Sequence, residues 1–172
     1  SSEILNPNIA ELTEGNVEII YTNENPNFVH DMNGFKVSVD AYEIAKVTDM
    51  NGDFYIEFDD QTDGYVITAK VTLDNTTDKA MYYNSNLLIQ LTNESDYYQS
   101  GRTFVREEYP KSSIEEETSK WGAGEKVTGL VTFPLTNDEF DALATVKPKL
   151  VIEGGLADNA NFSGMYREKA IF

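Results

Sequence analysis

The chain has no cysteine, one histidine and one tryptophan among its 172 residues. The absence of cysteine excludes structural disulfides, thiolate metal sites and cysteine nucleophiles. His30 precedes Asp31 in a predicted turn, where a solvated side chain is expected, so a Ser-His-Asp triad is not favoured. No apolar run reaches the roughly 18 residues that a membrane-spanning helix needs.

Basic residues are also scarce: 13 Lys and Arg face 30 Asp and Glu, which gives a net charge of −17. Such a surface repels phosphate backbones and anionic headgroups, so we expect neither nucleic-acid binding nor direct binding to a membrane. High charge of one sign also keeps a protein in solution. The sequence has no glycine-rich phosphate loop and no catalytic motif, so we expect no cofactor and no enzymatic activity.

Apolar residues make up 40 % of the chain and aromatics 12 %, which is enough for a folded core. The clearest pattern runs from Gly64 to Thr92. Apolar residues alternate with polar ones there, as in a strand with one buried face. The inward positions are Tyr65, Ile67, Ala69, Val71 and Leu73. Five short polar residues, 74–78, favour a turn, so we expect a second long strand over 79–92 as the partner of the first.

Asn-Gly steps mark two more predicted hairpins, in the repeated segments Asp31–Gly34 and Asp49–Gly52. The alternation between them predicts a long strand over 35–47, bent or bulged near Glu43, with residues 54–58 as its partner. Val127, Val131 and Phe133 are expected to face the core. Thr136 with Glu139 has capping-box spacing, which predicts one or two helical turns after Thr136.

Seven or more short strands without regular strand–helix alternation indicate an all-β fold. We therefore predict an antiparallel, immunoglobulin-like β-sandwich with one or two short helices. The sandwich is expected to occupy residues 17–172. Residues 1–16 are expected to form a flexible N-terminal arm.

A long connection, residues 99–124, carries several basic and aromatic residues in this acidic chain. Arg, Tyr and Trp dominate binding hot spots. Arg106, Tyr109 and Trp121 are therefore the candidate partner-binding residues. The alternative is that the basic residues neutralise nearby carboxylates while Trp121 packs as a lid on the core.

Asp49, Asn51 and Asp53 resemble part of a calcium loop, because carboxylate and amide oxygens are the ligands that calcium prefers. The spacing does not match an EF-hand, since the sixth position counted from Asp49 is Phe54 and not glycine. Asp and Asn are also the usual residues of turns. The acidic turn at 59–63 is expected at the opposite end of a short strand.

Three segments, VTLDNTTDKAMYY at 71–83, WGAGEKVTGLVTFPL at 121–135 and KPKLVIEG at 147–154, carry a resemblance. They are similar to immunoglobulin-like domains in exported proteins and lipoproteins of Gram-positive bacteria. Residues 15–40 resemble more specifically the YcdA-type lipoproteins of Bacillus. The resemblance implies a sandwich outside the cytoplasm. It also implies a tether through a lipidated cysteine upstream of Ser1. It supplies no catalytic motif.

These observations favour a non-enzymatic binding or interaction module at the bacterial cell surface. Its partner is expected to be a protein or a cell-wall component of unknown identity. Two alternatives remain open at this point. One is an extracytoplasmic hydrolase that uses carboxylates, and the other is a purely structural surface domain.

Overall fold

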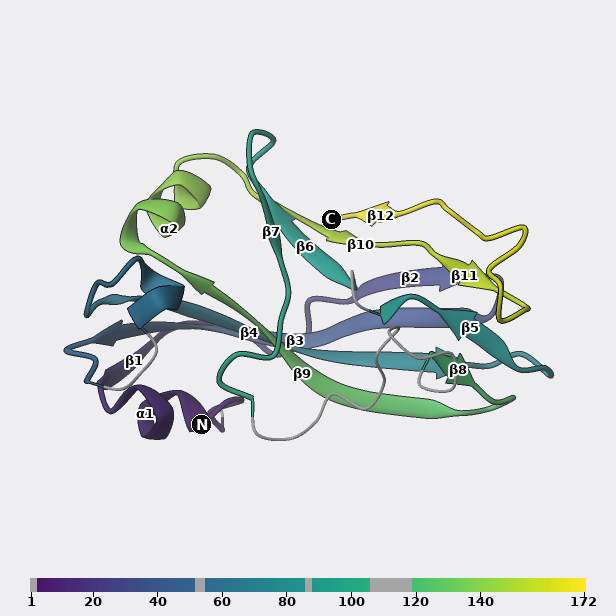
Figure 1. Ribbon diagram of the computed structural model, residues 1–172, viewed down its shortest axis with the longest axis horizontal. Coiled ribbons are helices and arrows are strands. Elements are labelled where there is room, and N and C mark those ends of the chain that lie inside the picture. Colours follow the sequence, from purple (N-terminus) through teal and green to yellow (C-terminus); the bar gives the residue numbers. More distant parts are fainter. Residues whose placement is uncertain (1–2, 52–54, 86–87, 106–118) are drawn as a thin grey trace.

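The computed structural model describes residues 3–51, 55–85, 88–105 and 119–172. It is an antiparallel β-sandwich, as predicted: one large sheet faces a second layer made of two smaller sheets (Figure 1). Two α-helices accompany the strands, α1 (Asn8–Thr13) and α2 (Asn137–Ala144). No helix in the described part of the chain is long and apolar enough to cross a membrane.

The large sheet has the strand order β1-β3-β4-β9, and β2 pairs with the first half of β3. Its strands are β1 (Asn16–Asn23), β2 (Phe28–Met32), β3 (Phe35–Thr48), β4 (Gly64–Asn75) and β9 (Lys126–Leu135). All of its pairings are antiparallel.

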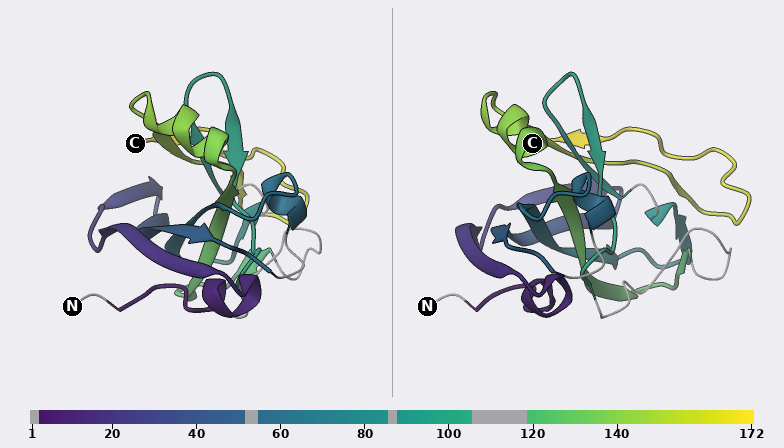
Figure 2. Two further views of the ribbon diagram at one scale, coloured as in Figure 1. Left: turned by 90° about the vertical axis from the view of Figure 1, so that its left-hand side faces the viewer. Right: turned by 60° about the vertical axis from the view of Figure 1, so that its left-hand side comes forward.

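The second layer contains one sheet of order β12-β10-β6-β7 and one of order β11-β5-β8. The first is built from β6 (Ile89–Thr92), β7 (Tyr97–Gln99), β10 (Lys149–Ile152) and β12 (Ala170–Ile171). The second is built from β5 (Met81–Tyr83), β8 (Lys120–Trp121) and β11 (Leu156–Ala157). Figure 2 shows this layer over one face of the large sheet, here called the inner face, while α1 lies on the opposite, outer face.

A β-bulge divides β3 into two halves. The register between β3 and β4 shifts between Val39 and Ala41, so Asp40 is the extra residue. Before the bulge the odd-numbered side chains, such as Val37, are buried on the inner face; after it the even-numbered Tyr42 and Ile44 take that face. The bulge was expected near Glu43 and lies three residues earlier.

Because of this shift, the large sheet carries a core on each face. The main core lies between the layers and includes Phe35, Val71, Trp121 and Phe133. A smaller core lies on the outer face. It is formed by Ile9, Ala45, Val47, Met50, Phe58, Val66 and Phe104.

The N-terminal segment packs against the outer face through this smaller core. Ile9 is fully buried there. The carboxylate of Glu43, which is 1 % exposed, accepts hydrogen bonds from the backbone N–H groups of Leu5 (2.9 Å) and Asn6 (3.0 Å). The Asn6 amide donates to Thr68 at 3.3 Å. In its described part, the segment expected as an arm is thus bound to the sheet by specific contacts.

Asn75 ends β4 and directs the chain into the second layer. Its side-chain N–H₂ group donates to the carbonyls of Lys79 (2.9 Å), Trp121 (3.1 Å) and Gly122 (3.0 Å). Its side-chain oxygen accepts from the N–H and the hydroxyl of Thr77.

The predicted hairpin of two long strands over 65–92 is wrong. β4 pairs with β3 and β9, while β5 and β6 belong to the other layer.

The predicted strand over 54–58 is also wrong. Residues Tyr55–Phe58 form a short 3₁₀ helix, η1, and β3 pairs directly with β4. Phe58 fills the smaller core, whereas Ile56 is 82 % exposed. Ile56 and Phe58 can point in different directions in either a 3₁₀ turn or a strand. The alternation at 54, 56 and 58 therefore did not distinguish the two structures.

Several local predictions are confirmed. Asn33 and Gly34 have positive φ (55° and 103°) in the hairpin between β2 and β3. The last inward positions of β9 are buried in the main core at Val131 and Phe133. Thr136 and Glu139 form the capping box that opens α2.

Asn75→Asp should lower the free energy of unfolding by several kcal/mol, because a buried carboxylate would face three carbonyl oxygens and have no proton to donate. Asn93→Asp is the matched control. The Asn93 side-chain oxygen accepts from Ser95 and Asp96 N–H groups, a role that aspartate keeps. Urea unfolding of both variants measures the difference. Equal losses would show that the donor contacts of Asn75 contribute little.

Alkaline pH should destabilise the fold partly through Tyr83. Burial, and secondarily the Glu153 carboxylate, raises the pKa of Tyr83 in the folded state. Its hydroxyl donates to the Glu153 carbonyl at 2.8 Å. Because the unfolded phenol titrates near pH 10, this group's contribution is complete below about pH 10. It is lost at up to ~1.4 kcal/mol per pH unit above that.

Tyr83→Phe should therefore show a shallower fall in unfolding free energy between about pH 10 and 11.5 than the unaltered protein. Tyr82→Phe, at the half-buried neighbouring position, is the control and should keep the steeper fall. Denaturant unfolding at several pH values gives both slopes. Parallel curves for the three proteins would contradict the assignment to Tyr83.

Candidate functional site

An apolar cleft lies between the two layers at the end of the sandwich that carries α2. Its volume is about 480 Å³, within the range of about 300–1,000 Å³ that is usual for small-molecule sites. The lining side chains are mostly aliphatic and aromatic. They are Phe28, Tyr42, Ile44, Ile67, Ala69, Leu91, Phe133, Phe140, Leu143, Ala144, Lys147, Pro148, Lys149, Leu150 and Phe172.

The bulge in β3 and the position of α2 account for the apolar character of the cleft. After Asp40, the even-numbered Tyr42 and Ile44 point to the inner face and line the cleft together with Ile67. Figure 1 shows the layers diverging toward α2, and side chains fill the space less completely there. Ile44 and Ile67 are consequently only half-buried.

Helix α2 forms one wall and is held in place at its first turn. The Thr136 hydroxyl accepts from the Glu139 N–H at 3.1 Å, and the Glu139 carboxylate accepts from the Thr136 N–H at 2.8 Å. Phe140 stacks on Tyr65 of β4, with ring centroids 3.8 Å apart. Leu143, one turn later, is buried and lines the cleft. The helix is thus fixed to the large sheet beside the cleft.

The opposite wall includes the C-terminal residue of the chain. Phe172 stacks on Phe28 of β2 with a centroid distance of 4.9 Å. Its backbone pairs with Leu150 in both directions, at 2.8 and 3.0 Å. This pair of rings thus joins β2 of the large sheet to the last residue of the chain, which follows β12 of the second layer.

Polar groups in the cleft wall are few. Lys147, on the connection after α2, and Lys149, the first residue of β10, flank Pro148, and all three residues are exposed. The Lys149 ammonium pairs with Glu94 at 3.1 Å. Burial raises the pKa of the Tyr42 hydroxyl, against a smaller opposite effect from a hydrogen bond with Asn23. This arrangement suits the binding of an apolar group better than acid–base chemistry, which needs positioned titratable groups.

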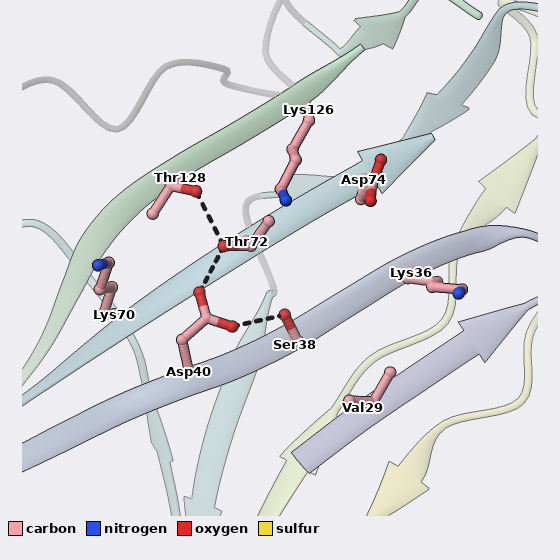
Figure 3. A pocket seen from close by; sticks show the side chains of 9 residues that line it. All are labelled: Val29, Lys36, Ser38, Asp40, Lys70, Thr72, Asp74, Lys126 and Thr128. Atoms are coloured by element: carbon pink, nitrogen blue, oxygen red, sulfur yellow. Dashed lines mark hydrogen bonds between the residues drawn. The ribbon is translucent and has the colours of Figure 1, made fainter. Parts of the chain in front are cut away.

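A second surface depression, on the outer face, is polar (Figure 3). In the pairing register, Lys36 of β3 lies opposite Asp74 of β4, and Asp74 lies opposite Lys126 of β9. Opposite charges in directly paired positions stabilise a sheet. Lysines and aspartates thus alternate across this depression.

The neighbouring row of this depression consists of hydroxyls around the bulge. Asp40 accepts from Ser38 at 2.8 Å and from Thr72 at 2.5 Å, and Thr72 also contacts the Thr128 hydroxyl at 2.9 Å. Figure 3 shows this chain of contacts running across three strands. It satisfies the bulged residue, so we assign this surface a structural role.

The structure corrects the interpretation of Trp121 as a partner-binding residue. Its side chain has no exposed surface and packs edge-on against Phe35, with a centroid distance of 5.7 Å, and against Tyr83 at 6.3 Å. Trp121 belongs to the main core, in line with the alternative stated above. Arg106 and Tyr109 lie outside the described residues.

The acidic turns lie side by side and not at opposite ends of a strand. The Asp49 N–H donates to the Asp63 carboxylate at 3.0 Å, and the Asp49 carboxylate accepts from Asn16 at 3.3 Å. The Asn51 N–H donates to the Thr13 carbonyl at 2.9 Å. Within the described ranges, no group of three or more His, Asp or Glu side chains is arranged to hold a metal ion. Asp53 lies outside those ranges.

His30 is buried and not solvated, because it lies on the inward face of β2. Its Nε2 is 2.8 Å from the Glu168 carbonyl oxygen.

The cleft itself was not predicted. The available signals were Phe140 and Leu143, three residues apart on one helical face, and the Lys-Pro-Lys step that follows.

Comparisons with known proteins agree on the fold. A functionally unknown protein from Listeria monocytogenes EGD-e superposes with a TM-score of 0.74 at 18 % identity, covering 95 % of this chain and 90 % of that one. The yjhA protein from Bacillus subtilis superposes with a TM-score of 0.54 at 14 % identity, covering 87 % and 97 %. Identities this low show a shared fold and nothing about activity.

A comparison with curated proteins gives no match. One family matches the whole chain, residues 1–172, and it is described as a domain of unknown function. The chain therefore belongs to the DUF5068 family.

Proposed function

We propose that this protein is a non-enzymatic binding module that acts outside the cytoplasm and holds an apolar group of its ligand in the cleft between the layers. The observation that carries the proposal is the apolar lining of about 480 Å³, which is open at the end of the sandwich beside α2. Half-buried Ile44, Ile67 and Leu91 leave apolar surface in contact with water there.

A ligand that covers this surface gains free energy from apolar burial. Each buried methylene contributes about 0.8 kcal/mol, so a chain of about ten carbons supplies several kcal/mol before the cost of association. The titratable side chains of the cleft lining are Tyr42, Lys147 and Lys149, with no carboxylate among them. This composition supports binding and gives no pair of carboxylates for hydrolysis.

The location outside the cytoplasm is supported by the sequence resemblance to YcdA-type lipoproteins of Bacillus. The matching structures from Listeria and Bacillus come from Gram-positive bacteria, in agreement with that resemblance. A net charge of −17 opposes direct adsorption to an anionic membrane. A covalent lipid on an upstream cysteine would hold the domain at the membrane in spite of that repulsion.

The neutral apolar dye N-phenyl-1-naphthylamine should bind saturably and gain fluorescence. Ala144→Trp should weaken this binding at least about fivefold, that is by about 1 kcal/mol. Ala144 lies at the exposed end of the lining, and an indole there would occupy the cleft. Val146→Trp, two residues further and outside the lining, is the control. Absent saturable binding, or equal binding by both variants, would overturn the proposal.

In cells that carry the natural gene, the protein should be found in the membrane fraction and be digested by protease added to protoplasts. A palmitate analogue should label it, and replacing the upstream cysteine should release it into the medium. A cytoplasmic protein of the same cells, which intact protoplasts protect from the protease, is the internal control. Recovery of unlabelled, protected protein would contradict both the compartment and the anchor.

A further inference from the structure

We infer that the ligand of the cleft is a single-chain anionic amphiphile, with its acidic head at Lys147 and Lys149 and its hydrocarbon tail between the layers. This inference rests on the proposed function and specifies its ligand class. It is carried by the placement of charge and by the gradient of burial along the cleft.

The charged side chains of the lining are opposite in sign to the net charge of the protein. The chain has 30 acidic and 13 basic residues, yet the lining contains two lysines and neither Asp nor Glu. A net charge of −17 opposes the approach of an anion to most of the surface. An anionic head therefore needs local cations, and Lys147 and Lys149 at the exposed rim of the cleft supply them.

Both lysines are available for such a contact. Lys147 has no ion pair within the described ranges. Lys149 pairs with Glu94, but the two side chains are 47 % and 74 % exposed. An ion pair this exposed is weak in water, so the Lys149 ammonium can also contact a ligand.

Burial increases from the lysines toward the floor. Ala144, Lys147, Pro148 and Lys149 are exposed, whereas Leu143, Ala69 and Phe133 are 5 %, 2 % and 1 % exposed. A molecule that enters past the lysines thus passes from cationic to mainly apolar surroundings. That order matches an amphiphile with one charged end. The cleft volume lies near the lower end of the usual range for small ligands, which fits one hydrocarbon chain better than two.

The lysines also follow the C-terminal end of α2, where a cation stabilises a helix through its dipole. This role predicts a change in stability alone. A change in ligand preference is the observation that separates the two roles, because helix stabilisation does not distinguish the charge of a ligand.

The experiment measures displacement of N-phenyl-1-naphthylamine by dodecanoate and dodecyltrimethylammonium, each below its micellar concentration, and by dodecanol below its solubility limit. Dodecanoate should displace the dye at the lowest concentration. Lys147→Glu should weaken dodecanoate about tenfold and leave dodecanol nearly unchanged. Lys126→Glu on the outer face makes the same change in net charge away from the cleft and should leave dodecanoate binding close to its original value.

Equal displacement by the three compounds, or equal effects of Lys147→Glu and Lys126→Glu, would overturn this inference while dye binding still supported the proposed function. A lower melting temperature of Lys147→Glu with unchanged dodecanoate preference would also overturn it and assign the lysine to the helix end. If the protein co-sediments with phosphatidylglycerol vesicles and does not bind dodecanoate, the cleft binds a membrane surface and not a single-chain ligand. Absence of saturable dye binding by the unaltered protein would refute the proposed function.

Discussion

The extra residue at Asp40 is the constraint on which the rest of this sandwich depends. Side chains along a strand alternate between faces, so one inserted residue exchanges the faces for everything that follows. Without it, Glu43 would point to the apolar inner face and Tyr42 to the outer one. With it, the inner face stays apolar as far as the cleft, and the outer face receives Ala45 and Val47 as the base of a second core. The hydroxyls of Ser38 and Thr72 satisfy the carboxylate that the bulge exposes.

Asn75 has a comparable role between the layers. A strand of twelve residues ends at a side chain that is fully buried and hydrogen-bonded on both its donor and its acceptor sides. Its contacts bring the start of β5, the end of β8 and the start of β9 to one point. The Asn-Thr-Thr-Asp segment, which resembles a recurrent element of exported domains, is therefore a crossing between layers and not a hairpin turn.

The prediction from sequence succeeded where the pattern is local and failed where pairing is distant. Alternation identified the inward residues of β4 and β9, and the capping box identified α2, because both depend on residues a few positions apart. The partner of β4 could not be chosen in this way, since an alternating strand fits any apolar neighbour. Trp121 was ambiguous for a related reason, because an aromatic residue in a long connection can face a partner or the core. The cleft depends on how two layers diverge, which no single segment encodes.

The hydrogen bonds from Leu5 and Asn6 to Glu43 fix more than the N-terminal segment. They place it on the outer face of the large sheet, whereas the cleft opens from the inner face beside α2. A tether attached before Leu5 would leave the domain from the side away from the cleft. If the lipid anchor proposed above holds the domain in that way, the cleft would face away from the bilayer, with Lys147 and Lys149 clear of its anionic headgroups.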